Sequence, residues 1–193
     1  VSFLMTPVVK SFAYKVGAID VPKDARRMHK VPIPRLGGLA IFIGFMVSIL
    51  LFVHIDHQMK GILLGAVIIV VLGVVDDMTP LRAKFKFLVQ ICAALVAVYH
   101  GVVIEILTNP NVFSDAPYWS LGWMKYPVTV LWIVGVTNAV NLIDGLDGLA
   151  SGVSTISAMT MLVIAILVSE QQVAIVMAAL AGACLGFMPY NKN

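Results

Sequence analysis

Two adjacent carboxylates, Asp76 and Asp77, follow directly on a run of uncharged and mostly apolar residues, 61–75. Side by side, two carboxylates repel each other unless a cation compensates their charge. Mg²⁺ prefers oxygen ligands and typically takes one or two carboxylates together with phosphate oxygens of a substrate. Lys84 and Lys86 follow shortly after and suit phosphate oxygens or lipid headgroups. The alternative is a solvated helix end with local ion pairs, which contribute little energy.

A second polar cluster lies in the stretch NAVNLIDGLDGLASG, residues 138–152. Asn138 and Asn141 are three residues apart and therefore share a helix face. Asp144 and Asp147 repeat this spacing, and a glycine follows each of them, which predicts a tight turn or a broken helix with exposed backbone. Polar side chains at the mouth of a membrane helix are costly and indicate a ligand site. The alternative is a glycine-rich turn between helices in which the Asp side chains serve as caps.

A third cluster is the basic stretch DARRMHKVPIPRLGG, residues 24–38. Two prolines stiffen it, which lowers the entropy lost when a loop becomes ordered. Such a loop suits an anionic ligand, although a loop that only sets membrane topology would also be rich in cations. Its basic side chains are Arg26, Arg27, His29, Lys30 and Arg35.

The elements that must position these clusters are apolar helices. Of the 193 residues, 60% are hydrophobic and only 12% are charged, against about 25% charged in soluble domains. Six runs lack Asp, Glu, Lys and Arg: 36–53, 61–75, 87–104, 126–143, 148–169 and 171–191. Their continuity excludes the alternating segments of a membrane β-barrel. We therefore predict an all-α fold, a polytopic membrane helix bundle of six spans preceded by the stump of an N-terminal helix, forming one integral membrane domain over residues 1–193.

Charge placement predicts the orientation of these spans. Alternate connections lie on opposite sides of a membrane, so 10–35, 76–86, 144–147 and the C-terminal tail share one side. That side carries eleven of the thirteen cations, and the other carries only Lys60 and Lys125. Cations concentrate on the cytoplasmic side, so all three polar clusters are expected at the cytoplasmic face. This asymmetry explains the positive net charge without nucleic acid as a partner.

On these residues the chain resembles the polyprenyl-phosphate N-acetylhexosamine-1-phosphate transferases, bacterial membrane enzymes that begin the synthesis of cell-surface polymers. The resemblance rests on HKVPIPRLGG (29–38), GVVDDMTPLRAKFKFLVQ (73–90) and NAVNLIDGLDGLASG (138–152). It implies transfer of GlcNAc-1-phosphate from UDP-GlcNAc to undecaprenyl phosphate, with release of UMP and with Mg²⁺, or alternatively Mn²⁺, as the metal. The first motif favours the branch that uses UDP-GlcNAc over the related phospho-MurNAc-pentapeptide transferases.

The resemblance also implies roles for individual residues. Asp76 and Asp77 match the acidic pair of the family, which binds the metal and positions or deprotonates the lipid phosphate. Asn138, Asn141, Asp144 and Asp147 match the motif that binds the nucleotide sugar, with Asp144 implied as a further metal ligand. The remaining candidates for contact with phosphate or for ordering the basic loop are Lys84, Lys86, Arg35 and His29.

The family's sequences continue beyond LGFMPYN (185–191), and the resemblance implies a further metal-binding Asp and a basic, histidine-rich loop that would lie beyond Asn193. We therefore expect the chain to be a fragment of a longer enzyme, inactive as an isolated 1–193 polypeptide. The expected location is the bacterial plasma membrane, with the active site at the cytoplasmic face, and a homodimer is compatible with the sequence. A secondary transporter is the main alternative from another class, although repeated halves with a site at the bilayer midplane are not apparent. A purely structural membrane subunit would leave the polar clusters without explanation.

Overall fold

The computed structural model describes residues 1–20, 33–34, 36–111 and 116–191. These residues are mostly helical and divide into two compact units. Unit 1 comprises residues 1–54, 70–81 and 141–193, and unit 2 comprises 55–69 and 82–140. The division describes compactness, and the expectation of a single integral membrane domain stays a prediction.

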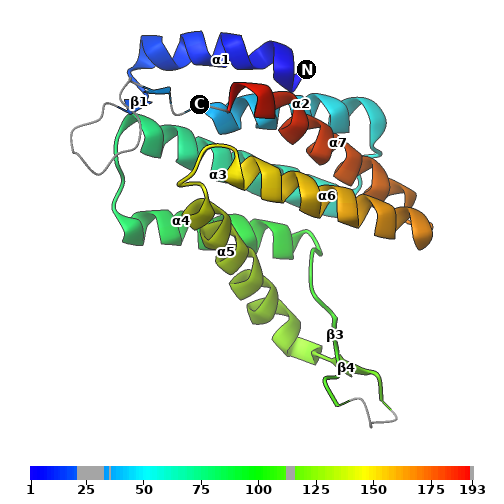
Figure 1. Ribbon diagram of the computed structural model, residues 1–193. Coiled ribbons are helices and arrows are strands. Elements are labelled where there is room, and N and C mark those ends of the chain that lie inside the picture. Colours follow the sequence, from blue (N-terminus) through cyan, green and yellow to red (C-terminus); the bar gives the residue numbers. More distant parts are fainter. Residues whose placement is uncertain (21–32, 35, 112–115, 192–193) are drawn as a thin grey trace. The chain divides into compact units, whose positions relative to one another are not determined.

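Unit 1 is built from α1 (Ser2–Val16), α2 (Gly37–Phe52), the end of α3 (His57–Met78), α6 (Leu149–Leu167) and α7 (Gln171–Phe187), followed by the 3₁₀ turn η2 (Met188–Tyr190). Helices α6 and α7, which are separated by only three residues, form a tight antiparallel hairpin that turns at Ser169, whose φ is 61° (Figure 1). Helix α1 packs on α2 and α7 at small residues: a Cβ added to Gly44 would lie 2.8 Å from Ser2 Cβ. These contacts require glycine at Gly44.

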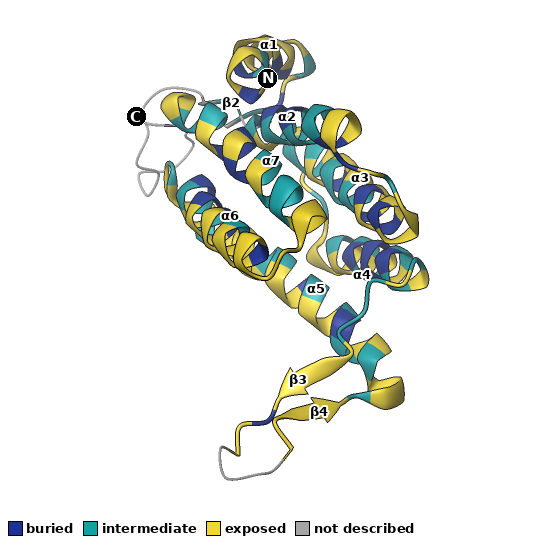
Figure 2. Ribbon diagram, turned by 90° about the vertical axis from the view of Figure 1, so that its right-hand side faces the viewer, coloured by how far each residue is buried: buried dark blue, intermediate teal, exposed yellow. Residues whose placement is uncertain are grey.

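Unit 2 contains the first part of α3, then α4 (Ala83–Tyr99), the 3₁₀ turn η1 (Gly122–Met124) and α5 (Lys125–Ile143) up to Val140. Helices α3 and α4 approach closely where a Cβ on Gly65 would lie 3.2 Å from the carbonyl oxygen of Ala93. The buried face of α4 is a stripe of three alanines and Gln90, and its burial is visible as dark blue in Figure 2. This stripe fixes the close spacing of the two helices.

Among the described residues, four helical segments are long and apolar enough to cross a membrane: His57–Met78, Gly122–Ile143, Leu149–Leu167 and Gln171–Tyr190. Each exposes large apolar side chains, such as Leu131 and Leu167, as surfaces that face lipid do. The two other predicted runs also form helices, but α2 has 16 residues and α4 has 17. At 1.5 Å per residue, α2 reaches only about 24 Å, less than the ~30 Å hydrocarbon core. The count of six spans therefore stays a prediction.

Three features differ from the sequence prediction. Helix α1 continues through Lys10 and Lys15, which the sequence pattern predicts in a connection. Two short antiparallel β-pairs interrupt the all-α pattern: β1 (Ile19–Asp20) with β2 (Ile33–Pro34), and β3 (Ile106–Thr108) with β4 (Tyr118–Ser120). The second pair lies in the longest connection, where Leu107 stands opposite Trp119. Strands of two or three residues carry too short a pattern to be recognised from sequence.

Candidate functional site

Asp76 and Asp77 lie in the last turn of α3, in unit 1, and both are half-buried. The apolar run ends at Val75, but the helix continues to Met78, so both carboxylates belong to the helix itself. Asp76 Oδ1 accepts a hydrogen bond of 2.8 Å from the backbone N–H of Leu81. Asp76 therefore has a structural role that the sequence did not reveal, because it orders the turn that leaves α3.

The DGLDG turn, residues 144–148, connects α5 to α6 as the sequence predicted. Its last residue, Gly148, is the N-cap of α6 and has φ 74° and ψ −8°, in the left-handed region. Ser151 Oγ donates a 3.2 Å hydrogen bond to the carbonyl oxygen of Gly148, and Asn191 Nδ2 lies 3.4 Å from Ser151 Oγ. Ser151 thus links the turn to the residue that follows η2, a link that the sequence analysis missed because 40 residues separate the two partners.

Asn141, Asp144 and Asp147 lie on or just before this turn, and all three residues are exposed. The carboxyl group of Asp144 is nevertheless partly shielded from water by surrounding protein atoms, and this desolvation raises its pKa above the usual 3.8. Desolvation disfavours the charged form of an acid. A cation beside Asp144 would offset this cost, and the assignment of Asp144 to a metal stays a prediction.

Asn138 lies in unit 2, three residues before Asn141 on α5, so the two amides occupy one face of the same helix as predicted. Its Nδ2 donates hydrogen bonds to Gln90 Oε1 at 2.7 Å and to the carbonyl oxygen of Val134 at 2.8 Å. Gln90 is a buried residue of α4. We did not single it out in the sequence, although it ends the motif GVVDDMTPLRAKFKFLVQ.

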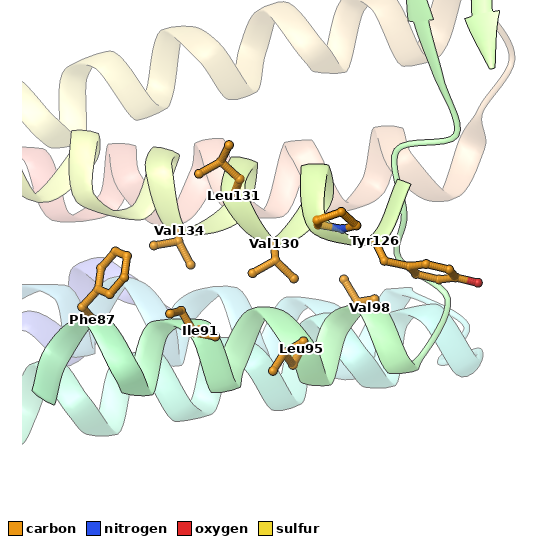
Figure 3. A pocket seen from close by; sticks show the side chains of 9 residues that line it. Phe87, Ile91, Leu95, Val98, Tyr126, Val130, Leu131 and Val134 are labelled. Carbon is orange, nitrogen blue, oxygen red and sulfur yellow. The ribbon is translucent and has the colours of Figure 1, made fainter. Parts of the chain in front are cut away.

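Lys84 and Lys86 stand in the first turn of α4 in unit 2, where Lys84 is exposed and Lys86 is half-buried. One residue further on, an apolar groove of about 370 Å³ begins between α4 and α5. Figure 3 shows Phe87 and Ile91 of α4 on one side and Val130 and Val134 of α5 on the other. Helix α4 thus carries two cations in its first turn and then forms one wall of this apolar groove.

Three positions used in the sequence prediction lie outside the described residues: His29, Arg35 and Asn193. The first two belong to the basic loop, and their contact with phosphate or their ordering of that loop stays a prediction. Asn193 is the position beyond which the further metal-binding Asp of the family is expected. That ligand, too, stays a prediction.

The acidic residues that the structure does describe form no complete metal cage. Across 1–20, 33–34, 36–111 and 116–191, no three His, Cys, Asp or Glu side chains are grouped so that they could hold a metal ion. Asp76, Asp77 and Asp144 therefore do not form a three-carboxylate site on their own. Their assignment to a metal stays a prediction, and it requires oxygen ligands from elsewhere.

Comparison with protein families matches residues 59–193, more than two thirds of the chain, to the family described as glycosyl transferase family 4. The chain is 43% identical over 189 residues to a probable undecaprenyl-phosphate N-acetylglucosaminyl 1-phosphate transferase of Bacillus subtilis, covering 97% of this chain and 52% of that protein. It is 31% identical to the decaprenyl-phosphate N-acetylglucosaminephosphotransferase of Mycobacterium tuberculosis, covering 99% of this chain and 51% of that one.

A phospho-N-acetylmuramoyl-pentapeptide-transferase of Heliobacterium modesticaldum is 36% identical over 182 residues, which are 89% of this chain and 56% of that protein. The chain thus spans about half the length of the curated relatives that it matches.

Proposed function

The chain belongs to glycosyl transferase family 4, and from that membership we propose that the protein transfers GlcNAc-1-phosphate from UDP-GlcNAc to undecaprenyl phosphate. An oxygen of the lipid phosphate attacks the β-phosphorus of UDP-GlcNAc. The bond from that phosphorus to the oxygen bridging the two phosphates breaks, and UMP leaves. The product is undecaprenyl-diphosphate-GlcNAc, the first intermediate of a cell-surface polymer such as teichoic acid.

The observation that carries this proposal is the 43% identity, over 97% of the chain, to a relative with this name. The residues at the ends of the helices support it. Asp76, Asp77, Asp144 and Asp147 are carboxylates that flank the membrane-spanning segments of a protein with very few charges. Apolar helices with acidic ends fit a reaction in which a lipid phosphate meets a water-soluble nucleotide sugar.

Mg²⁺ fits the donor set. It takes one or two carboxylates and completes its shell with water and substrate phosphates, so it does not require a cage of three protein ligands. We propose that one or two carboxylates of the set Asp76, Asp77 and Asp144 would hold it at a time, together with substrate phosphates, and Mn²⁺ offers the same coordination. When bound, the cation neutralises charge on the phosphates that must approach each other. Lys84 and Lys86 attract the phosphate oxygens, and the amides of Asn138 and Asn141 orient the nucleotide sugar.

The proposal includes an orientation in the membrane. With α2 and α4 added to the four long apolar helices, six spans place the ends of α3 and α5 on the side that carries most cations, which is the cytoplasmic side of a bacterial plasma membrane. Nucleotide sugars are made in the cytoplasm, so the reaction requires this face. We further propose that the apolar groove between α4 and α5 accommodates part of the prenyl chain, because its lining is apolar and its α4 wall begins beside Lys86.

One of the relatives is named for a different donor substrate. The relative of Heliobacterium modesticaldum is 36% identical and is named for the pentapeptide substrate, so UDP-MurNAc-pentapeptide is the alternative donor. The higher identity and coverage of the Bacillus subtilis relative favour UDP-GlcNAc.

The test is UMP release by the full-length protein, purified in detergent, with undecaprenyl phosphate as acceptor and each donor in turn, with and without Mg²⁺. We expect metal-dependent UMP from UDP-GlcNAc alone. UMP from the pentapeptide donor alone would move the protein to the other branch. A folded protein that releases UMP from neither donor would contradict the proposal and would make transport the next activity to test.

A further inference from the structure

Gln90 is a buried polar residue among small apolar residues. It is 8% exposed and occupies the buried face of α4, where the other buried residues are Ala93, Ala94 and Ala97. This face packs closely against α3, since a Cβ on Gly65 would meet the backbone of Ala93. Burying an amide among apolar groups is unfavourable unless it is hydrogen-bonded. If the residue at this position served packing alone, alanine would be more favourable. We therefore look for the role of the Gln90 amide in its hydrogen bond.

The hydrogen bonds of Asn138 fix which way both amides face. The Asn138 atom 2.8 Å from the carbonyl oxygen of Val134 must be the nitrogen, because two oxygens without a proton between them repel at that distance. The same nitrogen lies 2.7 Å from Gln90, so the Gln90 atom that faces it must be the oxygen Oε1. An Asn side chain has two N–H groups, and both are now engaged. Only its carbonyl oxygen Oδ1 is left to meet a ligand.

We propose that Gln90 is a positioning residue, which holds the Asn138 side chain so that its oxygen Oδ1, and not its nitrogen, is presented to the nucleotide sugar. This inference rests on the proposed function, which makes Asn138 a substrate-binding residue. It also narrows what Asn138 can recognise. An amide oxygen accepts hydrogen bonds, whereas ionised phosphate oxygens have no proton to donate. Asn138 therefore recognises an N–H or O–H group of the uridine or of the sugar, not the diphosphate.

Without Gln90 the Asn138 side chain keeps only the bond to the carbonyl oxygen of its own helix. It can then rotate away, and its nitrogen gains a free N–H that competes for other acceptors. Loss of a hydrogen bond between two uncharged groups, and of the orientation that it fixes, should lower kcat/KM by about tenfold. The KM for the nucleotide sugar should rise, and the KM for the lipid acceptor should be unchanged.

The test uses five variants of the full-length protein in detergent. Gln90→Met removes the acceptor at nearly constant volume, and Gln90→Glu restores it, because a carboxyl group offers an acceptor oxygen whether or not it is protonated. Asn138→Ala, alone and combined with Gln90→Met, shows whether Gln90 acts through Asn138. Gln58→Met is the matched control, since Gln58 also makes one hydrogen bond, of 3.1 Å to the carbonyl oxygen of Gly101, with no predicted role in catalysis.

We expect Gln90→Met to lower kcat/KM for UDP-GlcNAc about tenfold through a higher KM, with the KM for undecaprenyl phosphate unchanged. Gln90→Glu and Gln58→Met should stay within about twofold of the wild type. In the Asn138→Ala background, Gln90→Met should have no further effect. The proposal is overturned if Gln90→Met behaves like the wild type, or if its effect multiplies fully with that of Asn138→Ala.

Binding of UDP-GlcNAc, measured by calorimetry, supplies a readout that does not depend on turnover. A wild type that binds UDP-GlcNAc but releases no UMP would contradict the proposed function. The role of Gln90 would then be judged by binding alone: about tenfold weaker binding by Gln90→Met supports it, and unchanged binding overturns it. A folded wild type that does not bind UDP-GlcNAc overturns both. If Gln90→Met is not recovered as folded protein while Gln90→Glu is fully active, the buried acceptor is structural and the positioning role is also overturned.

Discussion

The two glycines of the DGLDG turn offer a matched pair that tests how the acidic turn is held. Gly148 has φ 74°, whereas Gly145 has no positive φ. For residues other than glycine the left-handed conformation costs about 1–2 kcal/mol. A Cβ on Gly148 would meet only the carbonyl oxygen of Asn191 at 3.5 Å, which is ordinary contact and adds no clash. Alanine also restricts the conformations of the unfolded chain, which stabilises the folded state by about 0.4–1 kcal/mol. We therefore expect Gly148→Ala to destabilise by about 1 kcal/mol.

Gly145→Ala is the control. A Cβ there meets nothing within 4 Å, so the variant should be neutral or slightly more stable than the wild type. For a chain of this size 1 kcal/mol corresponds to roughly 2–4 °C, so thermal unfolding in detergent should separate the two variants by at least a few degrees. Gly148→Asn should lie between them, because Asn tolerates the left-handed region better than Ala. Equal melting temperatures for the two Ala variants would refute the conformation assigned to Gly148.

Further predictions concern three other places in the chain. Asp76→Ala should lower activity by orders of magnitude and also lower the free energy of unfolding by about 1 kcal/mol. Asp76→Asn keeps an acceptor for the N–H of Leu81, so it should be as stable as the wild type but inactive. An active, folded Asp76→Asn would remove Asp76 from the proposed site. For Asp144→Asn the melting temperature is measured against pH in EDTA; the variant should match the wild type at low pH and become more stable than the wild type as the pH rises above 3.8. The reason is that ionisation of the desolvated carboxylate destabilises the wild-type fold. A stability difference that does not change with pH would contradict the raised pKa of Asp144. Gly61→Ala would place a Cβ against the Cβ of His100, the residue that follows α4, and should destabilise by about 1–3 kcal/mol. Gly73→Ala meets nothing within 4 Å and should not destabilise; similar melting temperatures for the two variants would contradict the packing of α3 on α4.

The sequence was informative about the helices because their signal is long. Every predicted apolar run forms a helix, since a stretch of about 20 apolar residues can satisfy its backbone in lipid only by helical hydrogen bonds. The DGLDG turn was also predicted correctly, because glycine twice follows an acid over a few residues. In both cases the pattern lies within one continuous segment, so no knowledge of tertiary packing is needed.

What the sequence missed depends on residues that meet only after folding. The partner of Asn138 is 48 residues away, and a single Gln in an apolar helix does not indicate which residue it faces. The hydrogen bond from Leu81 to Asp76 was missed for a different reason: Asp76 and Asp77 were interpreted by charge alone. The proposed metal site combines carboxylates with substrate phosphates, so protein residues account for only part of its ligands.

The central claim is that the transferred group is a phosphosugar and not the sugar alone. The most direct measurement uses UDP-GlcNAc labelled with ³²P in its β-phosphate, undecaprenyl phosphate and the full-length protein, with the label followed into the organic-solvent extract. We predict that the label moves into the lipid in the presence of Mg²⁺ and that unlabelled UMP stays in the aqueous phase. If GlcNAc reaches the lipid while the label remains in soluble UDP, the bond broken is the glycosidic one and the account is wrong.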